Sequence, residues 1–504
     1  MTAVRSATEA PTRNVEREVK LSAPPAFRMP DLTELQDGVA ARTLEPQHLQ
    51  TTYFDTEDLR LARWGMSLRF RNGQGWTLKL PANGDGPLLV RGEYTFAGDA
   101  AHPATEALDL TRACVRSARL KPVTRLRTLR RRMQLLDEDG TLLAEVSDDE
   151  VSILPGRRIA ARFRELEVEI TDAMTDGLLE RVVAELRAAG AGEPDPTPKY
   201  TRAVGPRAAE PPDVVVPELP GRPTAGDLVR RAIAASVLQL VQNDAVIRLG
   251  EDIEGVHHAR VATRRLRSHL RTFRPLLDAA WNGALRDELG WLGDVLGASR
   301  DADVLCERME SRVAELPDAE RAAGEAVVRS LADERAHARR ALIRAMGSAR
   351  YVELLDHLVD AAKTPPLTEE AALPGSSVVP LVAAQWKSLG RRERHAADPP
   401  TDNELHRIRI HAKRARYAAE AVAPVAGKQA KAFAAGAAVL RSVLGTHNDA
   451  VVAVRWLRAW ADQNADELAF GAGVIAGLER ADASASRREW RKVWKALVKR
   501  RPST

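Results

Sequence analysis

The chain has 504 residues, which is long enough for two or three domains. Its apolar fraction of 44% and charged fraction of 29% are those of an ordinary globular protein, and a net charge of +5 excludes a chain that is polycationic throughout. The two cysteines, Cys114 and Cys306, follow no metal-site or redox spacing, which suits structural thiols in a reducing cytosol. No secretory h-region and no apolar run of roughly 18–20 residues is present, so we expect a cytoplasmic protein without a membrane span.

The first half opens with residues 1–13, which we expect to be a disordered lead-in. An alternating segment follows, and in a strand Glu16, Glu18 and Lys20 would share one face. Two carboxylates about 6–7 Å apart along a strand can hold a hard divalent cation, and the lysine beyond them can hold a phosphate oxygen. The alternative is a solvent-facing edge strand, because a single Glu-x-Glu-x-Lys match is weak evidence.

Later segments repeat this alternation of charged and apolar positions, and the charges separate by strand. The acidic positions are Glu16, Glu18, Asp148, Glu165, Glu167 and Glu169. The basic positions are Lys20, Arg69, Arg71, Lys79, Arg125 and Arg127, with Arg91 beside Glu93 on one further strand and Arg130 where the alternation slips. A half-exposed sheet would scatter both signs, so the pattern predicts a barrel with its charged faces inward. Helices at 31–42, 105–118 and 174–189 would cover its apolar outer face.

Together with Tyr53-Phe54-Asp55-Thr56 and Lys199-Tyr200, this ordered set resembles the CYTH domain of the triphosphate tunnel metalloenzyme family. We place this domain at 14–204; one departure is Pro198, where the family often has a small polar residue. The resemblance implies an eight-stranded antiparallel β-barrel tunnel that binds a linear triphosphate with Mg²⁺ or Mn²⁺. Hydrolysis of a phosphoanhydride depends mainly on positioning and charge neutralisation, which suits a site built of cations and carboxylates.

The resemblance and the residue types together predict roles for the charged residues. The expected metal ligands are Glu16, Glu18, Asp148, Glu167 and Glu169, with Glu165 beside or among them. The expected triphosphate contacts are Lys20, Arg69, Arg71, Lys79, Arg91, Arg125, Arg127, Arg130 and Lys199. Lys20 and Glu93 are assigned the catalytic role. The alternative for each arginine is a surface salt bridge.

A proline-rich segment at 205–223 predicts a semi-rigid linker, and from 224 to 504 the period becomes helical. His257-x-x-Arg260-x-x-x-Arg264-Arg265-x-Arg267 returns 149 residues later as His406-x-x-Arg409-x-x-x-Lys413-Arg414-x-Arg416. Leu296-Gly297-x-x-Arg300-Asp301 returns 148 residues later as Leu444-Gly445-x-x-Asn448-Asp449. We therefore predict an internal duplication, with a loop at 364–380 between the halves.

The repeated segments place basic residues on one helical face, which is unfavourable beside its twin unless an anion lies between them. A solvated face or a nucleic-acid contact is the alternative, although few aromatic residues are interleaved for base stacking and no duplex-reading motif is present. This half resembles the CHAD domain, which implies two four-helix halves around a basic cavity that binds inorganic polyphosphate. The expected contacts are His257, Arg260, Arg264, Arg267, Arg271, His406, Arg409, Lys413 and Arg416.

The leading hypothesis is a metal-dependent inorganic triphosphatase that releases pyrophosphate and phosphate, joined to a polyphosphate-binding helical domain. A second hypothesis is a polyphosphate-binding scaffold whose tunnel is weak or inert. A third is a CYTH enzyme acting on thiamine triphosphate or on ATP, of the class IV adenylyl cyclase type. Such enzymes need a pocket for a ring, and only Trp64 and Trp76 are nearby aromatic candidates. Nucleic acid is not an expected partner, and the oligomeric state is left open.

Overall fold

The computed structural model describes residues 12–33, 35–81, 88–154, 158–464 and 466–501. The chain forms two compact units, the first ending at Asp213 and the second beginning at Val214. This boundary lies inside the segment 205–223 that we proposed as a linker. Of the expected lead-in, residues 1–11 lie outside the described ranges, whereas Thr12 and Arg13 already belong to the first strand. No helix within the described ranges is long and apolar enough to cross a membrane.

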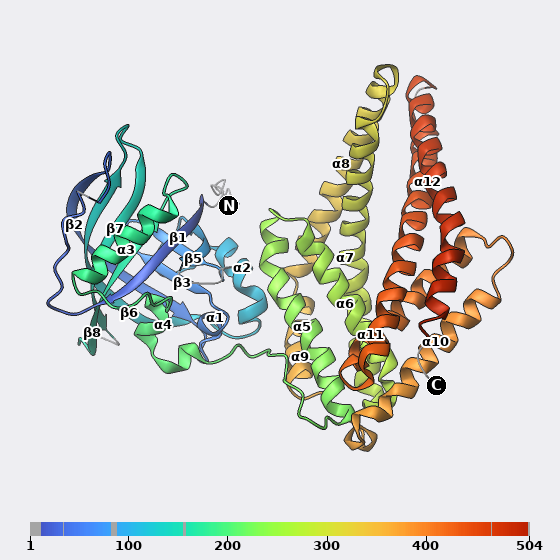
Figure 1. Ribbon diagram of the computed structural model, residues 1–504, viewed down its shortest axis with the longest axis horizontal. Helices are drawn as coiled ribbons and strands as arrows, with labels where there is room; N and C mark the ends of the chain where they lie inside the picture. Colours follow the sequence, from blue (N-terminus) through green and yellow to red (C-terminus); the bar gives the residue numbers. More distant parts are fainter. Residues whose placement is uncertain (1–11, 34, 82–87, 155–157, 465, 502–504) are drawn as a thin grey trace, which may run out of the picture. The chain divides into compact units, whose positions relative to one another are not determined.

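The first unit is built on a closed antiparallel barrel, as the sequence predicts (Figure 1). Its strands follow the order β1-β5-β4-β3-β2-β6-β7-β8 around the barrel. Their bounds are β1 Thr12–Ala23, β2 Ala40–Asp55, β3 Ser67–Arg71, β4 Gly75–Lys79, β5 Leu88–Phe96, β6 Lys121–Leu136, β7 Leu142–Leu154 and β8 Ala161–Ile170. Because side chains alternate along each strand, every strand presents one face to the interior and one to the outside.

Part of the outer face of the barrel is apolar and lies under helices. The helix α3 (Asp176–Ala188) buries Leu178, Val182 and Leu186 against Val19 and Val168 of the sheet. The helix α2 (Thr105–Val115) lies near β4 and β5, so the helices expected at 105–118 and 174–189 are confirmed. Short helices α1 (Arg60–Arg63), α4 (Lys199–Val204) and η1 (Pro206–Ala209) complete the unit.

The helix expected at 31–42 is wrong. The described residues of this segment form turns, and β2 already begins at Ala40. Leu32 is fully buried in the core beneath α3, so the apolar spacing reflects contacts of an irregular segment with the barrel. Gly38 adopts a φ of +81°, a left-handed conformation that cannot continue an α-helix.

The second unit is entirely helical in the ranges described. Its helices are α5 Ala225–Leu249, α6 Glu254–Thr272, α7 Ala279–Ala314, α8 Asp318–Met346, α9 Ala349–Lys363, α10 Val379–Arg394, α11 Asp402–Ala461 and α12 Asp466–Val498, with short turns η2 Arg274–Leu276, η3 Glu369–Ala372 and η4 Gly375–Val378. Gly427, with a φ of 68°, divides α11 into two helical parts. The first half of the duplication is therefore α5 to α8, and the second is α10, the two parts of α11, and α12.

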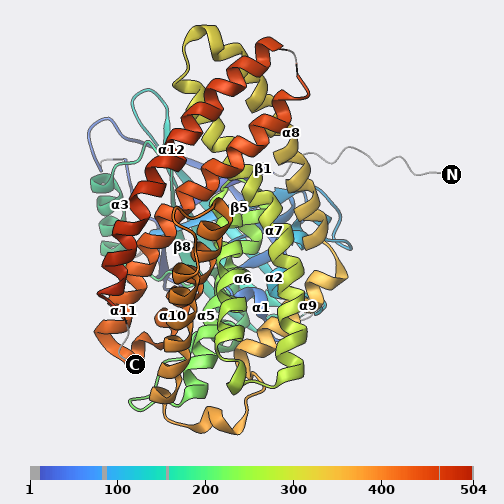
Figure 2. The same cartoon turned by 90° about the vertical axis from the view of Figure 1, so that its right-hand side faces the viewer.

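The repeated basic segments lie on α6 and on the first part of α11. The hairpins α7–α8 and α11–α12 extend away from them, and Figure 2 shows the far ends of α8 and α12 side by side. An apolar cluster at these helices includes Met309, Leu331, Leu457 and Ile475, all buried. This packing joins the two halves of the duplication.

Candidate functional site

The barrel interior carries a continuous charged face, because the strand registers align charged residues across neighbouring strands. Glu16 pairs with Arg91, Glu18 with Glu169, Lys20 with Glu167, and Lys79 with Glu93. Directly opposed residues share a face, so these side chains all point inward. All of them except Glu18 line an interior cavity of about 230 Å³, together with Arg69, Arg71, Arg130 and Lys199.

Two buried lysines are fixed by carboxylates in this cavity. Lys20 Nζ lies 3.1 Å from Glu18 Oε2 and also pairs with Glu167. Burial by itself would lower the pKa of Lys20, but Glu167 and Glu18 outweigh it and hold this pKa above its usual value. Lys79 Nζ lies 2.5 and 2.6 Å from the carboxylate oxygens of Glu16 and 3.1 Å from Glu93. Lys20 therefore stays a cation and cannot serve as a base.

On opposite sides of the cavity, charged side chains lack a partner of opposite charge among the described residues. Burial raises the pKa of Glu169 to about 7, with Glu16 and Glu18 adding to the effect. On the other side, burial and the neighbouring Arg69 lower the pKa of Arg71 to about 10. Arg71 bonds only the neutral Thr51, at 3.1 Å, and Gln74, at 2.9 Å, and no carboxylate pairs with it in the ranges that the structure describes. One side thus has surplus carboxylate and the other has surplus cation.

Asp148, which the sequence analysis assigned to the metal, lies on the outer face of β7. Arg164 binds both its oxygens, with distances of 2.7 and 2.8 Å. The neighbouring Asp149 is the one inside the barrel, where Arg130 donates to it at 2.8 and 2.6 Å and Lys199 pairs with it. Adjacent residues of a strand face opposite sides, so the Asp-Asp pair supplies one carboxylate to each face. The prediction that Asp148 lies in the barrel interior is therefore wrong, and Asp149 lies there instead.

Arg125 and Arg127 are also not in the interior, contrary to the sequence prediction. Both are exposed, and they lie beside a shallow hollow lined by Gln50, Asn72 and Leu154. The β6–β7 register is unbroken from Arg125 to Leu135, so the slip expected before Arg130 does not occur. Arg130 shares its inward face with Leu126 and Thr128, and the odd-numbered arginines point outward.

One end of the barrel interior is filled by apolar side chains. Tyr200 of α4 stacks on Tyr53 with ring centroids 4.8 Å apart, and its hydroxyl donates to Asp55 at 2.9 Å. Leu126 and Val151 pack around them. Lys199, one residue earlier, points into the charged cavity, where it lies 3.2 Å from Glu165 and 3.4 Å from Glu167. Pro198 precedes α4 and does not prevent this contact.

The residues of the acidic side fit a hard divalent cation. Glu16, Glu18, Glu167 and Glu169 offer carboxylate oxygens, which are the donors that Mg²⁺ and Mn²⁺ prefer. Burial and the neighbouring Glu167 raise the pKa of Glu18, although Lys20 lies 3.1 Å and Arg91 3.4 Å from its carboxylate. Among the described residues, no three His, Cys, Asp or Glu side chains already form a ligand cluster. Glu165 is buried farther along β8, beside Lys199 and Arg202.

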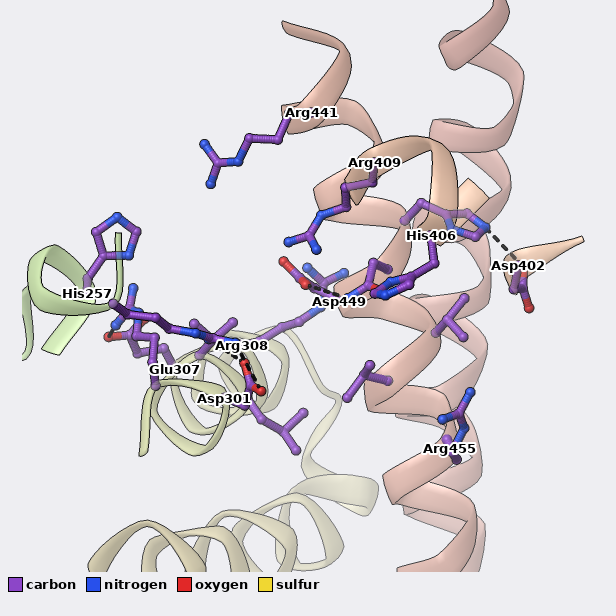
Figure 3. Close-up of a pocket in the computed structure, with 18 of the residues that line it drawn as sticks. His257, Asp301, Glu307, Arg308, Asp402, His406, Arg409, Arg441, Asp449 and Arg455 are labelled. Carbon is purple, nitrogen blue, oxygen red and sulfur yellow. Dashed lines mark hydrogen bonds and ion pairs between the residues drawn. The ribbon is translucent and has the colours of Figure 1, made fainter. Parts of the chain in front are cut away.

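The helical unit has a central cavity of about 740 Å³ that both repeats line (Figure 3). His257, Arg260 and Arg264 come from α6, and His406 and Arg409 come from α11. The repeated glycines lie beside the guanidinium groups. A Cβ at Gly297 would lie 3.6 Å from Arg260 Nη2, and one at Gly445 would lie 3.8 Å from Arg409 Nε. A larger side chain at either position would occupy the place of an arginine.

The central cavity is mixed in charge, whereas the sequence predicted a wholly basic face. Arg260 donates to Asp301 at 2.6 and 3.3 Å, and Asp449 and Asp402 also line the cavity. Beside this cavity, burial and the nearby Arg264 lower the pKa of Lys413, which lines a neighbouring hollow, to about 7. The Nε atoms of Arg264 and Arg409 are buried and have no hydrogen-bond partner among the described residues. Such groups are favourable contacts for an anion.

The remaining predicted residues of the helical unit lie in two different places. Arg264, Arg267, Arg271 and Lys413 line a second hollow of about 210 Å³, which we call the side hollow. Arg416 lines neither the central cavity nor the side hollow, because Glu420 accepts a hydrogen bond from its Nε at 2.6 Å. The prediction that Arg416 faces the cavity is therefore wrong.

Several site residues were missed by sequence reasoning. The sequence did not distinguish Asp149 from Asp148, because either member of an Asp-Asp pair fits the alternation. Arg441 and Arg455 line the central cavity from the second part of α11, and Arg414 lines the side hollow. Arg414 was visible in the repeat, but Arg441 and Arg455 lie outside it and reach the cavity only because the chain bends at Gly427.

The ring pocket considered for a nucleotide or thiamine substrate is absent from the described interior. Trp76 is fully buried on the outer face, where it packs against Phe54 and Phe70. Trp64 donates from its indole nitrogen to Asp213, at 2.9 Å. Neither tryptophan lines the interior cavity.

Comparison with known proteins agrees with this two-part architecture. A family model of the CYTH domain matches residues 13–200, and one of the CHAD domain matches residues 231–458. The uncharacterized protein Rv2226 of Mycobacterium tuberculosis is 33% identical over 503 residues, covering 92% of this chain and 93% of the relative.

Two solved structures are also similar. PptA from Streptomyces chartreusis is 24% identical with a TM-score of 0.46, and the match covers 54% of this chain and 99% of that chain. The CHAD domain from the plant Ricinus communis is 25% identical with a TM-score of 0.48, covering 58% of this chain and 97% of that chain. CYTH domains belong to a family of triphosphate-tunnel enzymes. With both domain models matched in order and a relative similar along nearly its whole length, the chain belongs to the family of proteins that join a CYTH domain to a CHAD domain.

Proposed function

We propose that the barrel is a divalent-cation-dependent triphosphatase that hydrolyses inorganic triphosphate to pyrophosphate and phosphate. The observation that carries this proposal is the separation of surplus charge inside the barrel. Arg71 has no carboxylate partner among the described residues, whereas Glu169 on the other side has no paired cation there. A linear polyanion together with a divalent cation would compensate both sides at once.

The interior residues have distinct parts in this reaction. Arg69, Arg71, Arg91 and Arg130 would bind the phosphate oxygens, since guanidinium groups suit two-point contacts with phosphate. Lys20 stays protonated and would stabilise the negative charge that develops on the phosphoryl oxygens. Glu93 contacts Lys79 at 3.1 Å and Arg69 at 3.6 Å, which makes it a positioning residue.

Glu16, Glu18, Glu167 and Glu169 would hold Mg²⁺ or Mn²⁺. The cation would neutralise phosphate charge and lower the pKa of the attacking water. Water would attack the terminal phosphorus and lose a proton to the solvent, the anhydride P–O bond would break, and pyrophosphate would leave with the bonding electrons. The fixed cations along β3, β5 and β6 would keep the chain extended for an in-line displacement.

The shape of the cavity favours inorganic triphosphate over thiamine triphosphate or ATP. Its only aromatic residues are Tyr53 and Tyr200, which are buried and stacked on one another. A base or thiazole ring would need an apolar slot, and inserting one here would separate the two tyrosines. Both cysteines are buried, which suits the expected reducing cytoplasm.

For the helical unit, we propose binding of inorganic polyphosphate in the central cavity. The buried, unpartnered Nε atoms of Arg264 and Arg409 support this, as does the depressed pKa of Lys413. A polyanion between α6 and α11 would relieve the repulsion among these groups. The two units together would place polyphosphate binding and triphosphate hydrolysis on one chain.

The decisive experiment is phosphate release by the purified chain from triphosphate, ATP and thiamine triphosphate. Each substrate is tested with Mg²⁺, with Mn²⁺ and after EDTA. The double variant Glu16→Gln/Glu18→Gln is compared with Glu150→Gln, which removes a carboxylate from the exposed outer side of β7. We expect rapid, cation-dependent release from triphosphate that only the double variant abolishes. No release, or release that survives the double variant, would leave polyphosphate binding as the function of the protein.

A further inference from the structure

The internal duplication makes paired positions on α6 and α11 equivalent, and the pairing breaks at one point. With the offset of 149 residues, Arg265 corresponds to Arg414, and Arg267 corresponds to Arg416. By the same offset, Glu420 of the second repeat corresponds to Arg271 of the first. At this position the first repeat has a basic residue and the second repeat has an acidic one. The two residues lie on α6 and α11, the helices that carry the repeated basic segments.

On one side of α6 and α11, a carboxylate of the second repeat neutralises one arginine from each helix. Glu420 accepts from Arg416 Nε at 2.6 Å and from Arg265 Nη2 at 3.3 Å. Both guanidinium groups also lie over the ring of Tyr417, at 5.9 and 5.2 Å from its centroid. The cations on this side already have an internal counterion and an aromatic contact.

On the other side, the equivalent positions have no counterion. Arg267, Arg271 and Arg414 line the side hollow, and no carboxylate pairs with any of them within the described part of the chain. Burial and the neighbouring Arg271 and Arg267 lower the pKa of Arg414 to about 10. Arg267 lies against α7, where a Cβ at Gly290 would be 3.4 Å from its Nη2. The guanidinium groups are thus held close together although they repel one another.

The side hollow adjoins the central cavity, because Arg264 lines both. Resting on the proposed polyphosphate binding, we propose that the phosphate chain leaves the central cavity on one side only, over Arg267, Arg271 and Arg414, while Glu420 closes the equivalent exit. A chain that continues over the side hollow gains charge-assisted contacts and relieves repulsion. On the other side, the same chain would meet the carboxylate of Glu420 and would have to displace it from two arginines.

The test uses the full chain and two size fractions of linear polyphosphate, a short one that the central cavity can hold and a long one. The principal variant is Arg271→Glu, which gives the first repeat the residue of the second. Arg271 lies at the exposed rim of the side hollow, so this change disturbs little packing. The matched control is Arg416→Gln, which removes one positive charge at the position equivalent to Arg267 on the closed side.

We expect Arg271→Glu to weaken binding of the long fraction about tenfold or more, because a charge-assisted contact becomes a repulsive one. Binding of the short fraction should stay unchanged. The slope of log affinity against log salt should decrease by at least about 0.7 for the long fraction, since one phosphate contact is lost at about 0.7 per contact. A purely structural effect would not change this slope selectively. Arg416→Gln should leave affinity and slope for both fractions at the wild-type level.

The reverse variant, Glu420→Arg, should open the second exit and strengthen long-chain binding with a steeper salt slope. If Arg271→Glu and Arg416→Gln behave alike, or Glu420→Arg has no effect, the one-sided exit is wrong although polyphosphate binding stands. If the wild-type chain binds neither fraction, the proposed function of the helical unit fails together with this inference.

Discussion

Asp148 and Asp149 provide a sharp test of the barrel site, because neighbouring carboxylates of the same type face opposite sides of one strand. Each is buried and binds an arginine through both oxygens, Asp148 to Arg164 and Asp149 to Arg130. Removing one partner of a buried ion pair costs about 3–5 kcal/mol. Because Arg130 retains a contact to Glu167 at 2.6 Å, we expect the Asp149→Asn cost near the lower end of that range.

The stability effects of Asp148→Asn and Asp149→Asn should therefore be similar. At about 2–4 °C per kcal/mol for a domain of this size, a loss of about 3 kcal/mol lowers the Tm of the barrel by about 6–12 °C. Activity should separate the variants. Asp149 orients Arg130 and Lys199, and a misplacement of about 1 Å in binding groups can reduce the rate about 100-fold.

The assay is steady-state phosphate release from triphosphate at 25 °C, where both variants are folded, with Tm measured on the same preparations. We expect kcat/KM to fall about 100-fold for Asp149→Asn and to stay close to the wild-type value for Asp148→Asn. Equal losses in both variants, or a larger loss for Asp148→Asn, would refute the assignment of Asp149 to the site.

Three further predictions concern charge. Arg71→Ala should lower kcat/KM about 10- to 100-fold, corresponding to one lost charge-assisted contact, whereas Arg125→Ala and Arg127→Ala on the outer face should not; a comparable loss in all three would contradict the observed register. The pKa of Glu169, raised by burial to about 7 from 4.5, means that the folded barrel binds this proton more tightly than the unfolded chain does. In cation-free buffer its contribution to stability is complete below about pH 4.5 and is lost as the pH rises through about 7, so Glu169→Gln should flatten that part of the profile of Tm against pH. Because the pKa of Lys413 is lowered to about 7, bound polyphosphate should raise it, and calorimetry in buffers of different ionisation enthalpy should detect proton uptake that Lys413→Arg abolishes.

Much of the architecture could be predicted from local patterns. Alternation with a period of two identified strands whose charged faces turn inward, and the change to a helical period located the second unit. The repeat around His257 and His406 indicated the duplication, and the glycines at 297 and 445 accompanied it. These features depend on the chain alone, because secondary-structure period and repetition are properties of residue order. The segment 31–42 shows the limit, since its apolar spacing serves contacts with the barrel in an irregular conformation.

Only the tertiary structure decided which charged residues meet. Strand register selected Asp149 over Asp148 and Arg130 over Arg125 and Arg127, because one position along a strand changes the face of the sheet. Arg416 meets Glu420 within α11, four residues on, a contact that spacing alone allows. Packing of α6 on α11 decided that Arg265 also reaches Glu420, while Arg271 has no such partner among the described residues. The residue types by themselves indicated that the barrel strands carry both acidic and basic residues. The physical reason is that the interaction of two charges depends on the distance between them in space, and sequence spacing does not determine that distance.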